Sequence, residues 1–187
     1  MICGIDEAGR GPLAGPVCAA AVILGGDFPL DLLNDSKKMT AIRRDQVRLI
    51  ILNKAVAWGI GWASHTEIDD INILQASLLA MKRAYEDMIK RNSGLSEENI
   101  KAIIDGNFAP DLNIPCEAMV KADTKVAEVM AASILAKTER DNYMDKMAEL
   151  YPNYGYEKHK GYPTKAHREA VLKHGFSPIQ RVSFKVK

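Results

Sequence analysis

Four acidic residues of the sequence share one kind of position. Asp6 and Glu7 follow the apolar run Ile2–Ile5, and Asp105 ends another apolar run. Asp123 stands between a predicted strand and a predicted helix. Ligand sites in α/β proteins gather at strand ends. Carboxylates buried together repel one another and lose hydration, so a cation would have to lie among them, and oxygen ligands favour Mg²⁺ or Mn²⁺.

Each carboxylate also has a simpler explanation. Asp123 could cap the following helix by accepting a backbone N–H, and Asp105-Gly106 is a common turn pair. Glu7 could face solvent. The Asp6-Glu7 pair is harder to explain in this way, because Gly9-Arg10-Gly11-Pro12 lies just beyond it and provides exposed backbone and a fixed cation.

Other chemistries find little support. The residues His65, His159, His167 and His174 lack the spacing of a zinc site, and no cysteine pair accompanies them. No Gly-x-Ser-x-Gly elbow indicates a serine hydrolase. The glycine-rich string after Glu7 lacks the Gly-Lys-Ser/Thr ending of a phosphate-binding Walker loop.

Composition indicates a folded protein of one domain. The chain has 187 residues, of which 47% are hydrophobic and 26% charged. The best candidate for a membrane span, Val17–Leu24, is too short, and no signal peptide is indicated. Cys3, Cys18 and Cys116 are predicted to be free thiols in a reducing cytoplasm.

Charge is distributed unevenly along the chain. Residues 137–187 hold 11 Lys/Arg and 6 Asp/Glu, a net charge of +5, whereas the rest hold 14 and 18, a net charge of −4. This suits an enzyme that binds phosphates with one part and cations with another. An ordinary solvated surface is the other explanation, and the commoner one.

Hydrophobic periodicity predicts the elements that would position these residues. A hairpin is expected from strands 2–5 and 17–24, followed by a helix capped by Thr40 and a strand over 56–63. The clearest helix, 73–90, carries a predicted buried stripe of Leu74, Leu78, Met81, Tyr85 and Met88. Strands at 101–105 and 117–121 and helices at 124–151 and 164–174 complete the chain. The pattern is typical of an α/β fold on a mixed sheet.

Several strings, taken in order, resemble bacterial ribonuclease HII. The opening string is GIDEAGRGPLAGPV at residues 4–17, and NDSKK follows at 34–38. Later come IDG at 104–106, AASILAK at 131–137 with Arg140-Asp141, HKGYPT at 159–164 and SPIQRVSF at 177–184. Short strings are weak evidence singly, but together they cover nearly the whole chain.

The resemblance implies a fold, a metal site and a reaction. The fold would be ribonuclease H-like, with a central mixed β-sheet flanked by α-helices and a helical C-terminal segment, forming one catalytic domain over 1–187. Two Mg²⁺ or Mn²⁺ ions would be held by four catalytic carboxylates: Asp6, Glu7, Asp105 and Asp123. The enzyme would hydrolyse the RNA strand of RNA–DNA hybrids and cut 5′ of single ribonucleotides in duplex DNA. The first strand begins at residue 2, which leaves no room for the extra N-terminal domain of type 3 enzymes.

The resemblance also implies how substrate is bound. Backbone groups of Gly9, Arg10 and Gly11 would contact the 2′-hydroxyl that marks RNA, and Tyr162 would stack on the sugar at the RNA-to-DNA junction. A plain tight turn and a packing aromatic are the alternatives. Other predicted substrate or phosphate contacts are Ser36, Lys37, Lys38, Lys158, Lys160 and Lys165. The expected partner is nucleic acid and not a membrane, the chain is expected to be a monomer, and the expected location is the cytoplasm.

Some positions depart from the family pattern. Ala122 stands where glycine is usual before the fourth carboxylate, and Gln180 stands where histidine is frequent. Glu128 and Met130 replace the common serine and isoleucine. Ala122 is the change that bears on the geometry of Asp123.

Two other functions remain open at this point. An integrase-like or resolvase-like nuclease would share the carboxylates but would not require a 2′-hydroxyl, and the Gly-Arg-Gly turn and Tyr162 argue against it. A non-catalytic nucleic-acid-binding module would use the basic C-terminal part alone. Carboxylates near a phosphate would then repel the ligand, which disfavours this second alternative.

Overall fold

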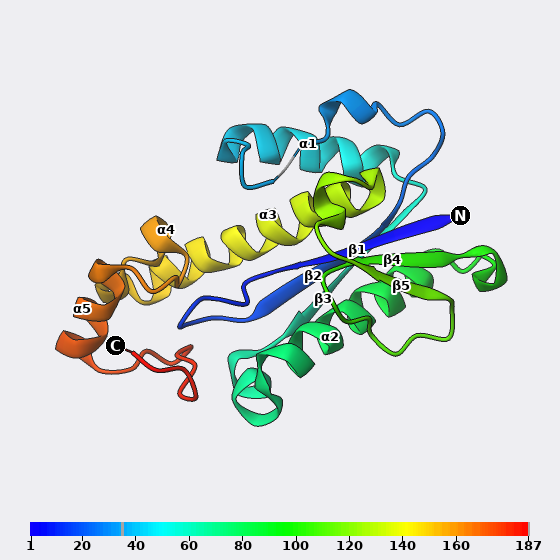
Figure 1. Ribbon diagram of the computed structural model, residues 1–187. Helices are drawn as coiled ribbons and strands as arrows, with labels where there is room; N and C mark the ends of the chain where they lie inside the picture. Colours follow the sequence, from blue (N-terminus) through cyan, green and yellow to red (C-terminus); the bar gives the residue numbers. More distant parts are fainter. Residues whose placement is uncertain (35, 187) are drawn as a thin grey trace.

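Five strands form one mixed sheet in the computed structural model, which describes residues 1–34 and 36–186 (Figure 1). They are β1 (Ile2–Ala8), β2 (Val17–Ile23), β3 (Ala57–Ala63), β4 (Lys101–Asp105) and β5 (Cys116–Met119). Their order across the sheet is β3-β2-β1-β4-β5. Strand β2 runs antiparallel to β1 and β3, whereas β4 is parallel to β1 and to β5. The predicted mixed α/β fold is confirmed.

Helices cover both faces of this sheet. They are α1 (Ala41–Lys54), α2 (His65–Arg91), α3 (Ala127–Leu150), α4 (Tyr156–His159) and α5 (Lys165–His174). Short 3-10 turns lie at Leu30–Leu32, Glu97–Asn99, Ala122–Thr124 and Pro152–Tyr154. Figure 1 shows α2 on one side of the strands, α1 and α3 on the other, and α4 and α5 beyond the β1–β2 turn. None of the helices within the two described ranges is long and apolar enough to span a membrane.

Small residues bring two helices close to the sheet. A Cβ at Gly61 of β3 would lie 2.1 Å from the carbonyl oxygen of Ala80 in α2. A Cβ at Gly4 of β1 would lie 2.1 Å from the carbonyl carbon of Glu128 in α3. Such contacts would force the backbone apart, so helix packing depends on glycine at these positions.

Strand β1 is longer than predicted, and this changes the setting of two carboxylates. The expected strand ended at Ile5, but pairing with β2 continues to Ala8, which lies opposite Cys18. Asp6 and Glu7 are therefore strand residues and do not follow the strand. The fully buried β2 supplies the partner that extends β1, and no local signal in 6–8 could reveal it.

The prediction for α2 missed its first turns. The helix begins at His65, eight residues before the expected start, behind a capping box in which Ser64 and Glu67 bond each other's backbone amides. Asn72, with φ of 68°, kinks the helix, and its side-chain oxygen accepts from the amides of Leu74 and Gln75. The expected helix is the part after this kink.

The buried face of α2 also differs from the predicted stripe. Met81, Tyr85 and Met88 are buried as expected, but Leu74 and Leu78 are only partly buried. The other buried positions of α2 are Ile68, Ser77 and three alanines, and the alanines permit the close approach to β3: Ala76, Ala80 and Ala84. A pattern that weights large apolar residues misses such a face.

The C-terminal segment packs on the β1–β2 turn. The Leu13 amide donates to the Gly161 carbonyl at 2.8 Å, and the Gly15 amide donates to the Ile179 carbonyl at 2.8 Å. A small core lies between the turn and this segment, formed by Ala14, Met144, Ala148, Tyr156 and Ile179. The predicted helical C-terminal segment is confirmed, and it fixes the turn that follows the first carboxylates.

Candidate functional site

Three of the four predicted carboxylates lie together. Residues Ile5 and Ile104 are paired on parallel strands β1 and β4, so the next residues, Asp6 and Asp105, lie side by side. One carboxylate oxygen from each of Asp6, Asp105 and Asp123 falls within 4.8 Å of the others. Asp6 and Asp123 are 5% and 6% exposed, so this acidic group is largely removed from water.

Asp123 reaches the group from a short 3-10 turn. Lys121 adopts a left-handed backbone conformation, with φ of 58°, and the chain then turns through Ala122–Thr124. The Ala122 amide donates to Asp105 Oδ1 at 2.7 Å, which ties this turn to the end of β4. The capping alternative for Asp123 is wrong, because α3 begins later, after Val126.

Glu7 stands apart from this group of three. Successive strand side chains alternate between faces, so Glu7 leaves β1 on the face opposite Asp6. Its Oε1 lies 3.5 Å from Arg10 Nη1, while its Oε2 is buried and has no hydrogen-bond partner in the described part of the chain. Glu7 nevertheless lines the same pocket as Asp6 and Asp105.

Burial and like charge act together on these carboxyl groups. Loss of hydration raises the pKa of Asp6 well above its usual range, and the charges of Glu7 and Asp105 raise it further. Burial also raises the pKa of Glu7, although Arg10 opposes this effect. The pKa of Asp105 is raised by burial and then by Asp123.

A hard divalent cation fits this donor set. Within the described residues, the possible ligand atoms that converge are carboxylate oxygens, and a cation among them would offset the repulsion that raises the pKa values of Asp6 and Asp105. The buried Glu7 Oε2 without a partner is a further unused acceptor beside them. Lys37 Nζ lies 3.3 Å from Asp123 Oδ2, on a side chain that is 75% exposed.

The turn after β1 lines the same pocket, which has a volume of about 210 Å³. Gly9, Arg10 and Gly11 form one wall, and Tyr162 lies across from Gly11, 3.6 Å from the position that a Cβ on that glycine would take. Tyr162 is 40% exposed. Acidic residues, open backbone and an accessible aromatic ring therefore share one pocket.

A family model for ribonuclease HII matches residues 3–187. The chain belongs to the ribonuclease HII family. Membership makes the protein a ribonuclease H, an endonuclease that acts on nucleic acid. It is 56% identical to the ribonuclease HII of Treponema denticola, with 100% of this chain and 99% of that relative covered. It is 52% identical to that of Dechloromonas aromatica, with 98% and 90% covered.

Solved structures support the same fold. Ribonuclease HII from Archaeoglobus fulgidus, solved in a complex with PCNA, is 25% identical and has a TM-score of 0.74, with 97% of this chain and 92% of that one covered. Bst-RNase HIII in complex with Mn²⁺ has a TM-score of 0.76 at 16% identity, with 99% and 67% covered, and this likeness concerns the fold alone.

The remaining predicted substrate residues of this ribonuclease HII family member differ in placement. Ser36 is buried in the pocket wall, where its hydroxyl lies 2.9 Å from that of Ser133. Lys37 lines the pocket, whereas Lys38 is exposed and does not appear in the pocket lining. Lys160 is held by Asp145 and by the Glu157 carbonyl, while Lys165 is 91% exposed.

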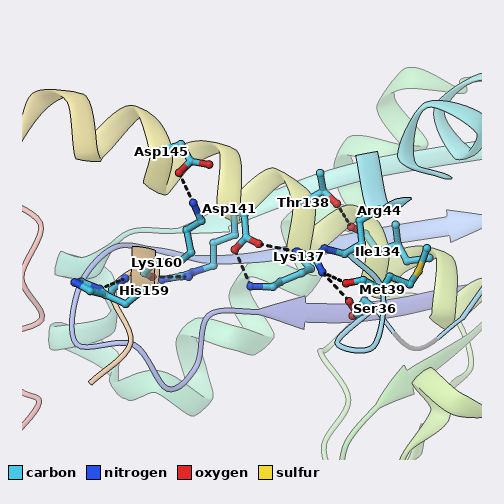
Figure 2. Close-up of polar contacts among 12 residues, drawn as sticks. Ser36, Met39, Arg44, Ile134, Lys137, Thr138, Asp141, Asp145, His159 and Lys160 are labelled. Atoms are coloured by element: carbon cyan, nitrogen blue, oxygen red, sulfur yellow. Dashed lines mark hydrogen bonds and ion pairs between the residues drawn. The ribbon is translucent and has the colours of Figure 1, made fainter. Parts of the chain in front are cut away.

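Two pocket residues of α3 were not predicted. Ser133 is 5% exposed, and its hydrogen bond to Asp6 opposes the rise in the pKa of that carboxyl group. Lys137, one helical turn later, also lines the pocket. Figure 2 shows Lys137 near Asp141, which accepts from its Nζ at 2.7 Å. Both residues belong to the string AASILAK, and their spacing of four on one helix face was the available signal.

The departures from the family pattern leave the carboxylates in place. Ala122 is fully buried and still donates its amide to Asp105, so its methyl group does not prevent the turn. Glu128 contributes only backbone to the contact with Gly4. Gln180 is 3% exposed, and neither of its side-chain polar atoms has a partner among the described residues.

Proposed function

We propose that this ribonuclease H hydrolyses the RNA strand of RNA–DNA hybrids and cuts 5′ of single ribonucleotides in duplex DNA. The products would be 5′-phosphate and 3′-hydroxyl ends, and the reaction would remove ribonucleotides during DNA replication and repair. One observation carries the proposal: Asp6, Glu7 and Asp105 line a single pocket with the Gly9–Gly11 backbone and Tyr162, and a carboxylate oxygen of Asp123 lies within 4.8 Å of those of Asp6 and Asp105. The residues proposed for hydrolysis and those proposed to contact the ribose would therefore lie side by side.

Asp6, Asp105 and Asp123 would hold two divalent cations, with Glu7 as the fourth ligand. When bound, such ions make water a stronger nucleophile and stabilise negative charge on the leaving oxygen of a phosphodiester. Mg²⁺ and Mn²⁺ both match an all-oxygen donor set. The buried carboxylates keep that set in place, because Asp6 also accepts from the Glu7 amide and Asp105 from the Ala122 amide.

Other residues of the pocket would bind and orient the substrate. Lys37 and Lys137 lie where they could contact phosphate oxygens, and the ring of Tyr162 is open to stack on a sugar. The backbone of Gly9, Arg10 and Gly11 would contact the 2′-hydroxyl, the group that distinguishes RNA from DNA. All of these groups come from one chain, so we propose that residues 1–187 act as one domain and as a monomer.

We also propose that the enzyme works in the cytoplasm. Cys3, Cys18 and Cys116 are free thiols, and Cys3 and Cys18 are buried. Unpaired cysteines are typical of a reducing compartment.

The test is cleavage of two matched DNA duplexes, one of which carries a single ribonucleotide. Each duplex is incubated with the protein in Mg²⁺, in Mn²⁺ and in EDTA, beside a long RNA–DNA hybrid. We expect metal-dependent cutting on the 5′ side of the ribonucleotide and cutting of the hybrid's RNA strand, with the all-DNA duplex intact. Equal cutting of both duplexes would instead indicate a general nuclease of the integrase or resolvase kind. Duplex binding without cutting in any metal would indicate a binding module.

A further inference from the structure

Two arginines are buried beneath the Gly9–Gly11 turn without an acidic partner. Arg140 in α3 is 1% exposed and Arg181 near the C-terminus is 0% exposed. Neither guanidinium lies within 4.0 Å of a carboxylate of residues 1–34 or 36–186. Buried charges are normally paired, so this arrangement calls for an explanation.

Backbone carbonyls of one short segment take the place of that partner. Arg181 Nη2 donates to the Gly9 carbonyl at 2.6 Å, and its Nη1 donates to the Arg10 carbonyl at 3.0 Å. Its Nε donates to the Gly15 carbonyl at 2.8 Å. Arg140 donates to the carbonyls of Pro16 and Ala14 and, outside the segment, to that of Lys160.

The two bonds from Arg181 to Gly9 and Arg10 orient consecutive peptide groups. In a planar trans peptide the C=O and the following N–H point in opposite directions, and no peptide bond of the described chain is cis. Carbonyls that face Arg181 therefore direct the amides of Arg10 and Gly11 to the other side of the turn. Within the described residues these two amides donate to no protein acceptor. Both residues line the acidic pocket.

The packing leaves this arrangement little freedom. Gly9 has φ of +103°, and a Cβ there would lie 2.1 Å from Arg140 Nε, so the turn rests directly on the guanidinium. Burial and the like charge of Arg140 lower the pKa of Arg181 to about 9. Two buried guanidinium groups without a carboxylate partner within the described residues therefore lie together on the underside of the turn.

We propose that Arg181, supported by Arg140, is a positioning residue that holds the amides of Arg10 and Gly11 toward the ribonucleotide. The inference rests on the proposed function, because it assigns a cause to the recognition of the 2′-hydroxyl by this turn. A guanidinium suits the task, since its rigid fork can bond two neighbouring carbonyls in a fixed geometry, whereas an ammonium group acts as a single point.

The test compares Arg181→Lys with the wild type by two measurements. The first is kcat/KM for the single-ribonucleotide duplex in Mg²⁺, and the second is the inhibition constant of the matched all-DNA duplex in the same reaction. Both are measured well below the melting temperature of each variant, so that loss of folded protein does not contribute. We expect kcat/KM to fall roughly tenfold, the value of one hydrogen bond, while the inhibition constant stays within about twofold.

Arg83→Lys is the matched control. Arg83 also donates to a backbone carbonyl, that of Trp62 at 2.8 Å, but it belongs to α2 and forms an ion pair with Glu67. Its replacement should change neither constant. The inference would be overturned if kcat/KM were unchanged in folded Arg181→Lys. It would also be overturned if the inhibition constant rose by the same factor by which kcat/KM fell. The proposed function would fail separately, through absence of ribonucleotide-dependent cutting by the wild type.

An amide-resolved NMR measurement on the wild type keeps the proposal testable if Arg181→Lys does not fold. With EDTA present, addition of the single-ribonucleotide duplex should shift the Arg10 and Gly11 amide signals more than addition of the all-DNA duplex. Equal shifts with both duplexes would mean that these amides do not report the 2′-hydroxyl, and the inference would be withdrawn.

Discussion

Asp6 of β1 belongs to the acidic group and lies beside Asp105 of β4, the neighbouring strand of the sheet. Asp6→Asn removes one charge and one proposed metal ligand but keeps the shape of the side chain. We expect cleavage to fall by roughly a hundredfold or more, because even groups that only orient ligands are worth 10- to 100-fold. Cleavage of the single-ribonucleotide duplex in Mg²⁺ measures this.

The same substitution should not reduce the stability of the metal-free protein. Burial and neighbouring charge raise the pKa of Asp6, so its charged form is costly without a cation. In EDTA, Asp6→Asn should melt at the same temperature as the wild type or higher. Asp70→Asn, at an exposed position of α2, is the control for both measurements. Full activity of Asp6→Asn would remove this residue from the metal site.

Gly9 and Gly11 both belong to the Gly-Arg-Gly string, but the fold tolerates a side chain differently at the two positions. Gly9 has a positive φ and touches Arg140, whereas a Cβ on Gly11 would make only an ordinary contact with Tyr162 at 3.6 Å. Gly9→Ala should therefore lower the free energy of unfolding by at least about 1 kcal/mol. Thermal or denaturant unfolding gives this quantity.

Gly11→Ala should show the opposite profile. We expect its stability to stay within about 0.5 kcal/mol of the wild type, because nothing in the fold opposes the methyl group. Its kcat/KM for the single-ribonucleotide duplex should fall at least roughly tenfold, because the methyl narrows the approach between the turn and Tyr162. An active Gly11→Ala enzyme would show that no substrate group passes close to this glycine.

Among the elements, residues 36–39 before α1 are tied to α3 by the side chain of Arg44, in addition to the contact of Ser36 with Ser133. Arg44 Nη1 donates to the carbonyls of Ser36 at 3.1 Å and Met39 at 2.6 Å, and its Nη2 lies 3.4 Å from Asp141 (Figure 2). Asp141 also holds Lys137, so one carboxylate orients a pocket lysine and the arginine that fixes the segment. Arg44→Met should lower the unfolding free energy by about 1.5–3 kcal/mol, because charged hydrogen bonds are lost.

Hydrogen exchange locates that effect. Peptides that cover Ser36–Met39 should exchange faster in Arg44→Met, and kcat/KM should fall because Ser36 and Lys37 line the pocket. The control is Arg43→Met, since Arg43 is exposed on the same helix. If both variants exchange alike, Arg44 does not hold this segment.

A pair of stacked histidines makes the C-terminal segment sensitive to pH. His159 in α4 and His167 in α5 lie with ring centroids 4.5 Å apart, and burial lowers the pKa of each. A lowered pKa means that the unfolded chain binds protons more readily than the folded one. The contribution of this pair to the free energy of unfolding should therefore be fully present above pH ~6.5, the ordinary histidine pKa. It should decline as the pH falls below that value.

Melting temperatures between pH 5 and 8 test this, with hydrogen exchange in α5 as the local readout. His167→Asn should flatten the acidic decline, although it also removes packing. His174→Gln should not, because His174 is exposed on the same helix. A decline of equal size in all three proteins would assign the pH dependence to other groups.

For the whole molecule, the sequence predicts most of the architecture but not the contacts between distant segments. The strands, the order of helices and the carboxylates follow from apolar runs and their ends. The group of three aspartates required the pairing of β1 with β4 and the turn at Lys121, which no local pattern shows. The burial of Arg140 and Arg181 was equally hidden, because arginine normally indicates surface.

The uneven charge along the chain also has a consequence for the whole molecule. If the basic part of 137–187 contacts the duplex, binding should weaken with salt, since each phosphate contact releases counterions. The Lys165 side chain is 91% exposed, and its ion pair with Glu169 is long, at 3.8 Å. Little interaction energy would therefore be lost when its Nζ moves to a phosphate. Lys165→Gln should reduce the slope of log affinity against log salt by about 1.

Fluorescence anisotropy with an all-DNA duplex in EDTA measures that slope without cleavage. Lys90→Gln is the matched control, because Lys90 is equally a lysine on an exposed helix face but lies on α2, away from the acidic pocket. Its slope should equal that of the wild type. If the slope of log affinity against log salt falls by the same amount in both variants, α5 has no particular part in binding. The positive charge of the C-terminal segment is then ordinary surface charge.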